Sequence, residues 1–136
     1  MRDFRLVSLR LTAALTGLSA LVACDNVFGP RACTMEMRPS VVVYVRDART
    51  DAYIAAGATM ILTDGAFVDS VTVPANQSGE NARGLWTFDS GERPGVYQVT
   101  VRRAGYEEWV RSGVWVRGGA CHVATVTITA RMVTSP

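Results

Sequence analysis

The chain has 136 residues, of which 49% are hydrophobic and 19% charged, and its 14 basic side chains, all arginine, exceed its 12 acidic ones by two. This length suits one domain with a substantial core, and the composition is that of a folded protein rather than a disordered one. A net charge of +2 is too small for the basic surface that nucleic-acid binding requires, so we expect no nucleic-acid partner.

The first 24 residues follow the pattern of an export signal. Three arginines in the first ten residues precede an apolar run over residues 11–22, which is shorter than the roughly 20 residues that a membrane-spanning helix needs. The run ends in Leu-Val-Ala-Cys at residues 21–24, which resembles the lipobox of bacterial lipoprotein signal peptides. The resemblance implies that residues 1–23 are removed and that the sulfur of Cys24 carries a diacylglyceryl group, with a further acyl chain such as palmitate on its amine. The alternative is an ordinary signal peptide with an incidental cysteine.

Processing at Cys24 changes what the composition implies. With Arg2, Arg5, Arg10 and Asp3 removed, eleven arginines and eleven acidic residues remain, so the mature chain carries no net charge. Two or three acyl chains hold a protein durably at a membrane, because each buried CH₂ contributes about 0.8 kcal/mol. We therefore expect anchoring to a membrane of the bacterial cell envelope, inner or outer, on its extracytoplasmic side.

Two cysteines remain once Cys24 carries lipid, namely Cys33 and Cys121. Thiols of an exported protein are generally oxidised, so we expect a Cys33–Cys121 disulfide that ties the start of the domain to its last strand. The alternative is a metal site that also uses His122. Two thiols and one adjacent imidazole are a poor set for structural zinc, which takes four well-spaced ligands.

The domain is expected over residues 33–136, after a short polar and turn-forming tether over residues 24–32. Its β-branched and aromatic residues recur at strand spacing, and no segment has a sustained helical period. The pair Asp64-Gly65 predicts a tight hairpin turn. The predicted strands cover residues 40–46, 58–63, 66–73, 85–88, 96–102, 109–116 and 122–132. Seven short strands at this spacing favour an antiparallel β-sandwich.

Four short motifs carry a further resemblance. They are VYVRD at residues 43–47, GATMIL at 57–62, GVYQVTV at 95–101 and GY at 105–106. In this order they resemble the carboxypeptidase regulatory-like domain over most of the mature chain. The resemblance implies an all-β, antiparallel, seven-stranded sandwich of transthyretin-like, Greek-key type.

The same motifs have direct physical consequences. Gly95 relieves steric strain in a turn, and Gly105 permits a positive φ at the next tight turn. Tyr97 is expected to bury its ring while its hydroxyl bonds to backbone across the corner of the sandwich. Tyr106 is expected to cover the end of the core, and Asp47 to cap the turn that follows its own strand.

Residues suited to catalysis or to cofactors are sparse. The chain has one histidine, His122, and contains no phosphate-binding loop, dinucleotide fingerprint or metalloprotease motif. An enzyme would need His122 and a free Cys121 in one cleft. We therefore expect a non-catalytic protein without catalytic residues, metal or cofactor.

Aromatic side chains are the strongest indication of binding. Trp109 and Trp115 are six residues apart and share a face if their strand is regular. Together with Tyr106 they are a candidate binding patch, although packing inside the sandwich is the alternative. We expect an accessory or protein-interaction module whose partner is an envelope protein or glycan; the alternative is a module that binds carbohydrate or a small ligand.

Overall fold

The computed structural model describes residues 33–86 and 92–136. The predicted signal peptide, the tether and Cys24 lie outside these residues. Across the described part of the chain, no helix combines the length and the apolar character needed to cross a membrane.

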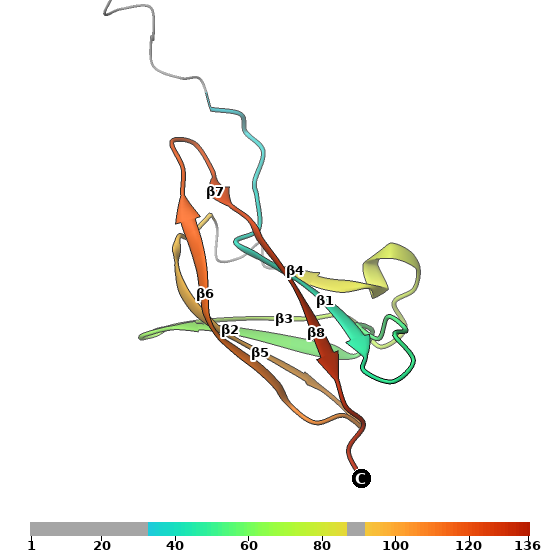
Figure 1. Ribbon diagram of the computed structural model, residues 1–136. Coiled ribbons are helices and arrows are strands. Elements are labelled where there is room, and N and C mark those ends of the chain that lie inside the picture. Colours follow the sequence, from blue (N-terminus) through green and yellow to red (C-terminus); the bar gives the residue numbers. More distant parts are fainter. Residues whose placement is uncertain (1–32, 87–91) are drawn as a thin grey trace, which may run out of the picture. The chain divides into compact units, whose positions relative to one another are not determined.

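The described residues form two β-sheets and a short 3₁₀ helix, η1 (Gly79–Ala82) (Figure 1). The smaller sheet has the strand order β4-β1-β8, and the larger one has the order β3-β2-β5-β6-β7. The strands are β1 (Val41–Asp47), β2 (Ala58–Asp64), β3 (Phe67–Thr72), β4 (Gly84–Trp86), β5 (Gly95–Arg103), β6 (Trp109–Gly118), β7 (Val123–Ala124) and β8 (Val126–Met132). The predicted all-β class is confirmed.

The last predicted strand, over residues 122–132, differs in the structure. It divides at Thr125 into β7, which pairs with β6 in the larger sheet, and β8, which pairs with β1 in the smaller one. Val123 and Ile128 are both buried although five residues separate them, so the inward-facing side changes across the break. A strand that passes from one sheet to the other in this way forms a corner of the fold.

Strand pairing is antiparallel throughout the larger sheet, whereas β1 and β8 of the smaller sheet run parallel. The fully antiparallel arrangement expected from the sequence is therefore wrong for this pair. Parallel strands need a long connection between them. Here that connection is nearly the whole domain, because β1 is the first strand and β8 the last.

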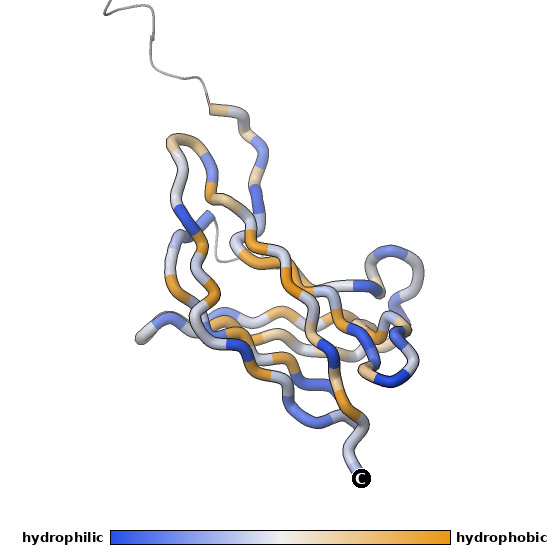
Figure 2. Tube along the Cα trace, viewed as in Figure 1, coloured by the Kyte–Doolittle hydropathy of each residue, from blue (hydrophilic) through white to orange (hydrophobic). Residues whose placement is uncertain are grey.

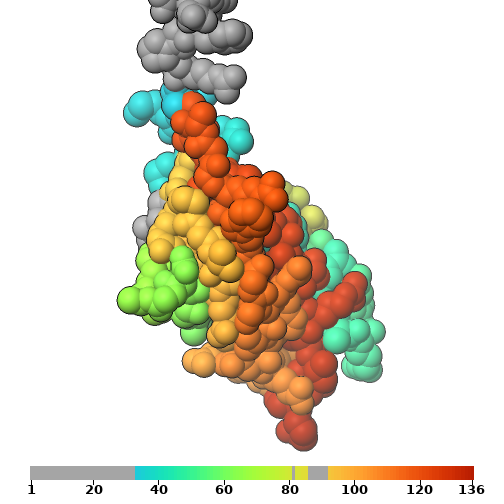
Figure 3. Space-filling model, turned by 60° about the vertical axis from the view of Figure 1, so that its left-hand side comes forward, coloured from blue at the N-terminus to red at the C-terminus, as the bar shows by residue number. Residues whose placement is uncertain are grey.

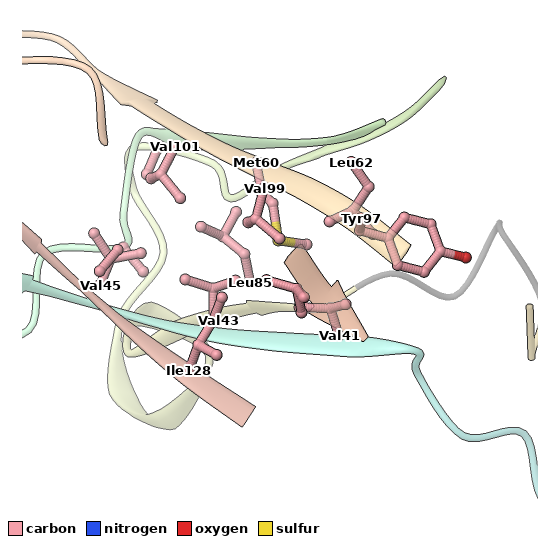
Figure 4. Close-up of a cluster of buried hydrophobic side chains, with 14 of the residues drawn as sticks. Val41, Val43, Val45, Met60, Leu62, Leu85, Tyr97, Val99, Val101 and Ile128 are labelled. Atoms are coloured by element: carbon pink, nitrogen blue, oxygen red, sulfur yellow. The ribbon is translucent and has the colours of Figure 1, made fainter. Parts of the chain in front are cut away.

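The core lies between the two sheets (Figure 4). Alternation along β1 buries Val41, Val43 and Val45, and alternation along β5 buries Tyr97, Val99 and Val101. Figure 2 shows this pattern as hydrophobic residues interspersed with hydrophilic ones along the strands. The remaining fully buried large side chains come from β2, β4, β6 and β8, and are Met60, Leu62, Leu85, Val116 and Met132.

Tyr97 occupies the edge of this core, as the sequence predicts. Its ring is fully buried, and its hydroxyl donates a hydrogen bond to the backbone oxygen of Arg93 at 2.8 Å. The guanidinium of Arg93 in turn donates to the hydroxyl of Tyr97 at 3.1 Å and to the carboxylate of Asp64 at 2.7 Å. Tyr97 therefore fixes the turn that leads into β5.

Candidate functional site

The predicted disulfide is present at one end of the domain. Cys33 and Cys121 are bonded, with 5.3 Å between their Cα atoms and 88 residues between them in sequence. The bond joins residues 33–39, which we call the stem, to the turn between β6 and β7. Because the sulfur of Cys121 is used in this bond, it is not the free thiol that a Cys–His nucleophile would require.

A hydrogen-bonded network lies beside the disulfide. Nδ1 of His122 is 2.7 Å from a carboxylate oxygen of Glu92, and Nε2 is 2.9 Å from the hydroxyl of Thr34. The same carboxylate accepts the backbone N–H groups of Arg38 at 3.0 Å and Val123 at 3.2 Å. Glu92 thus joins the stem to the β6–β7 turn; we call Thr34, Glu92, His122 and the disulfide the stem clasp.

The protonation of the clasp follows from its geometry. Burial raises the pKa of Glu92, but hydrogen bonds from His122 and from the two backbone N–H groups outweigh burial and lower that pKa overall. Since an ionised carboxylate only accepts hydrogen bonds, Nδ1 of His122 carries the proton that it shares with Glu92. The imidazole is thereby held in one orientation, with Nε2 toward Thr34. A hydroxyl, an imidazole and a carboxylate in this order also occur in hydrolases, but here they tie together two segments that the disulfide already joins.

A second polar centre lies at the opposite end of β6. One oxygen of Asp47 accepts the backbone N–H groups of Arg49 at 2.9 Å and Thr50 at 2.7 Å, and the other accepts the hydroxyl of Tyr106 at 3.0 Å. These bonds, the one from the Thr50 N–H foremost, lower the pKa of Asp47 from 3.8 to about 2. The predicted turn cap at Asp47 is confirmed, and the bond to Tyr106 links the turn after β1 to the turn before β6.

The turn between β5 and β6 borders a surface pocket of about 360 Å³. Gly105 there has φ +79°, as predicted, and Tyr106 packs partly against the core. The guanidinium of Arg103 lies 4.9 Å from the ring centre of Tyr106 and donates to a backbone oxygen on the neighbouring loop. Residues lining the pocket are Gly57, Thr59, Arg102, Arg103, Ala104, Tyr106 and Glu108. Within this lining Arg102 is ion-paired with Glu108, and the remaining guanidinium N–H groups suit a polar ligand with an anionic group.

The two candidate tryptophans of β6 face opposite ways. The register between β5 and β6 shifts between Tyr97 and Val99, and Gly113 in the same stretch has φ +71°. This bulge adds one residue to β6 and reverses its alternation. Trp109 therefore packs partly against the core, whereas Trp115 is 59% exposed on the outer face.

The predicted patch is consequently not one surface. Six residues of extended strand place Trp115 roughly 20 Å from Trp109 along β6, in addition to the change of face. Tyr106 lines the pocket at the Trp109 end. Whether any of the three binds a ligand stays a prediction.

The smaller sheet carries an exposed cluster of tyrosine and arginine that was not predicted from the sequence. Tyr44 of β1 lies edge-to-face with Tyr53, with 6.1 Å between the ring centres. Arg46 stacks over the ring of Tyr53 at 4.1 Å, and Arg83 lies 5.3 Å from the same ring centre. Alternation in residues 41–47 could have predicted two members of this cluster. Tyr44 and Arg46 must face outward when the valines that alternate with them face the core.

Comparison with known proteins provides no family assignment. No protein-family model matches the chain, and no curated protein shows significant similarity to it. Within residues 33–86 and 92–136, no three His, Cys, Asp or Glu side chains form a group suited to a metal ion.

Proposed function

We propose that this protein is a lipid-anchored domain of the bacterial cell envelope that binds a protein partner and performs no catalysis. The observation that carries the interaction role is the cluster of Tyr44, Tyr53, Arg46 and Arg83. Tyrosine and arginine dominate the energetic centres of protein interfaces, because they combine large contact area with several hydrogen-bond donors. Tyr44 and Tyr53 are 38% and 40% exposed, so a partner can cover both rings.

The envelope location is supported by the cysteines. The Cys33–Cys121 disulfide is of the kind that persists in oxidising compartments. The third cysteine, Cys24, follows the apolar run and completes the pattern that resembles a lipobox. Export therefore accounts for all three cysteines, because it would expose Cys24 to lipidation and Cys33 and Cys121 to oxidation.

The fold proposed in detail is a transthyretin-like sandwich similar to the carboxypeptidase regulatory-like domain. If β7 and β8 are one strand that changes sheets, the described strands number seven. The motif residues also have linked roles, since Asp47 of the first motif accepts the hydroxyl of Tyr106 from the last. An experimental structure with a different strand order would contradict this assignment.

The anchor is tested by the intact mass of the full-length gene product, purified from membranes of a lipoprotein-processing bacterium. The expected mass is that of a chain starting at Cys24 with added diacylglyceryl, and with two hydrogens missing for the disulfide. A Cys24→Ser variant should lose the lipid and leave the membrane fraction. An unlipidated wild-type chain would overturn the anchored function.

The interaction surface is tested by site-specific photocrosslinking in the same membranes. A photoreactive phenylalanine at Tyr44 should give one adduct of defined mass. Arg46→Glu should abolish it, because this change removes the guanidinium that stacks on Tyr53 and pairs with Asp51. Val68, 64% exposed on the other sheet, is the matched control position and should give no such adduct. Equal crosslinking from both positions, or none from Tyr44, would contradict the proposed surface.

The pocket beside Tyr106 favours a second candidate, the binding of an acidic sugar or similar small ligand. Arg102 is ion-paired with Glu108 and Arg103 donates one N–H to the backbone oxygen of Ala56, so their remaining guanidinium N–H groups are the donors open to a ligand. Aromatic residues commonly stack on sugar rings. Saturable binding of an anionic oligosaccharide, weakened by Arg102→Gln, would favour this candidate. A binding isotherm unaffected by Arg102→Gln would exclude the pocket.

A further inference from the structure

The end of the domain that carries the stem clasp has four large apolar side chains exposed on its surface. Met35 is fully exposed and Met37 is 58% exposed in the stem. Val96 and Trp115 are cross-strand partners near the same end of the larger sheet, and they are 56% and 59% exposed. Figures 1 and 3 place the stem and the turn between β6 and β7 together at this end. Large apolar side chains that gather on a surface indicate a contact that the isolated domain does not make.

Trp115 has a charged neighbour that suits one kind of contact. The guanidinium of Arg117 lies 4.4 Å from the centre of the Trp115 ring. Tryptophan and arginine together are typical of the interface between lipid headgroups and acyl chains, where an indole ring is half apolar and a guanidinium reaches phosphate.

The chain itself brings this end to a membrane. Eight residues lie between Cys24 and Cys33, and the nine Cα–Cα steps from one to the other span at most about 32 Å when extended. The stem clasp fixes Cys33 to the β6–β7 turn, so a lipid on Cys24 keeps this end of the domain, and not the end with the pocket, near the bilayer. Among the described residues of the stem and its neighbours, Arg38 is paired with Glu36, and the carboxylate of Glu92 is satisfied by hydrogen bonds from His122, Arg38 and Val123.

We propose that this end is a membrane-contacting surface, in which Trp115 and Val96 enter the interface of the same bilayer that holds the lipid on Cys24. The proposal rests on the lipid anchor proposed above. A patch of this size needs little affinity of its own, because a short tether makes the contact intramolecular at an effective concentration in the millimolar range. The contact sets the orientation of the domain and turns the pocket and the tyrosine–arginine cluster toward potential partners.

The test uses the lipidated full chain in vesicles of zwitterionic phospholipid, with and without bromine atoms near the headgroup end of the acyl chains. Bromine quenches tryptophan that reaches the acyl boundary, so the difference between wild type and Trp115→Phe isolates the signal of Trp115. We expect the Trp115 signal to fall by about half in brominated vesicles, as for a side chain buried several ångströms into the interface. Because the zwitterionic vesicles carry no net charge, raising the salt concentration should leave the quenching largely unchanged.

The matched control moves the tryptophan along the same strand and face. Val110, 47% exposed on the outer face of β6, lies near the opposite end of the strand. In the double variant Val110→Trp/Trp115→Phe, the new tryptophan should be quenched no more than the remaining two. Circular dichroism of each variant confirms that the fold is retained.

Three results would overturn the proposal, and they are distinguishable. Mass spectrometry of the same sample shows whether Cys24 carries lipid; an unlipidated chain ends both the anchor and the membrane contact. A lipidated chain whose Trp115 is not quenched removes the membrane contact alone. In the third result, Trp115 becomes more buried as the amount of protein per vesicle rises at constant lipid, but bromine does not quench it. This result would assign the surface to contact with a second copy of the chain.

Discussion

Removal of the Cys33–Cys121 disulfide is expected to lower the free energy of unfolding by about 4.6 kcal/mol. The bond closes a loop of 88 residues, and the figure follows from the loss of chain entropy in the unfolded state for a loop of that length at 25 °C. The perturbation is Cys33→Ser with Cys121→Ser, in a chain that begins at residue 24 and carries Cys24→Ser, so that no thiol remains.

The assay is urea unfolding followed by circular dichroism. With a dependence on urea of about 1.5 kcal/mol per molar, the midpoint should fall by about 3 M relative to the oxidised chain. The hydrogen bonds between His122 and Glu92 remain in this variant and still connect the stem to the β6–β7 turn. A loss below about 1 kcal/mol would refute the loop-entropy reasoning, and would mean that the oxidised native stem is strained or that the unfolded chain is compact.

Three further changes follow from particular contacts. Tyr97→Phe removes the hydroxyl that bonds the backbone four residues earlier, and should cost about 1–2 kcal/mol in urea unfolding; an unchanged midpoint would show that the corner does not need this bond. Gly113→Ala should cost about 1 kcal/mol through its positive φ alone, because an added Cβ meets no atom within 4 Å; a larger loss would indicate that β6 loses its bulge. Stability should also fall on acidification: the folded-state pKa values of Glu92 and Asp47 lie below their ordinary 4.5 and 3.8, so the stabilisation is complete above those values and is lost as the pH falls toward about 2. In thermal melts between pH 6 and pH 2.5, Glu92→Gln should have a shallower pH dependence than wild type, and an identical slope would contradict this assignment.

Local patterns were sufficient for much of the fold. Alternation in residues 96–102 matches the buried side of β5, and glycine after aspartate predicted the turn between β2 and β3, where Gly65 has φ +59°. Asp47 was also predictable as a turn cap, because a short acidic side chain reaches the backbone N–H groups two and three residues later. Each of these interactions is made within a few residues of chain.

Contacts between distant segments were not predictable in the same way. Glu92 and His122 are 30 residues apart, and no period or motif relates them. The separation of Trp109 from Trp115 depends on the bulge in β6, which exists only because β6 pairs with β5 in that register.

The sequence by itself predicted the strand content, the burial of Tyr97 and the cysteines that form the disulfide. Its N-terminal pattern resembles an export signal. These features follow from side-chain period and residue chemistry, which act over short distances along the chain. The tertiary structure alone decided that β8 leaves the larger sheet to pair with β1, that Tyr44 and Tyr53 meet, and that the exposed Trp115 lies at the same end as the stem. Those outcomes depend on which strands share hydrogen bonds, and that choice is made by the packing of the whole domain rather than by any one segment.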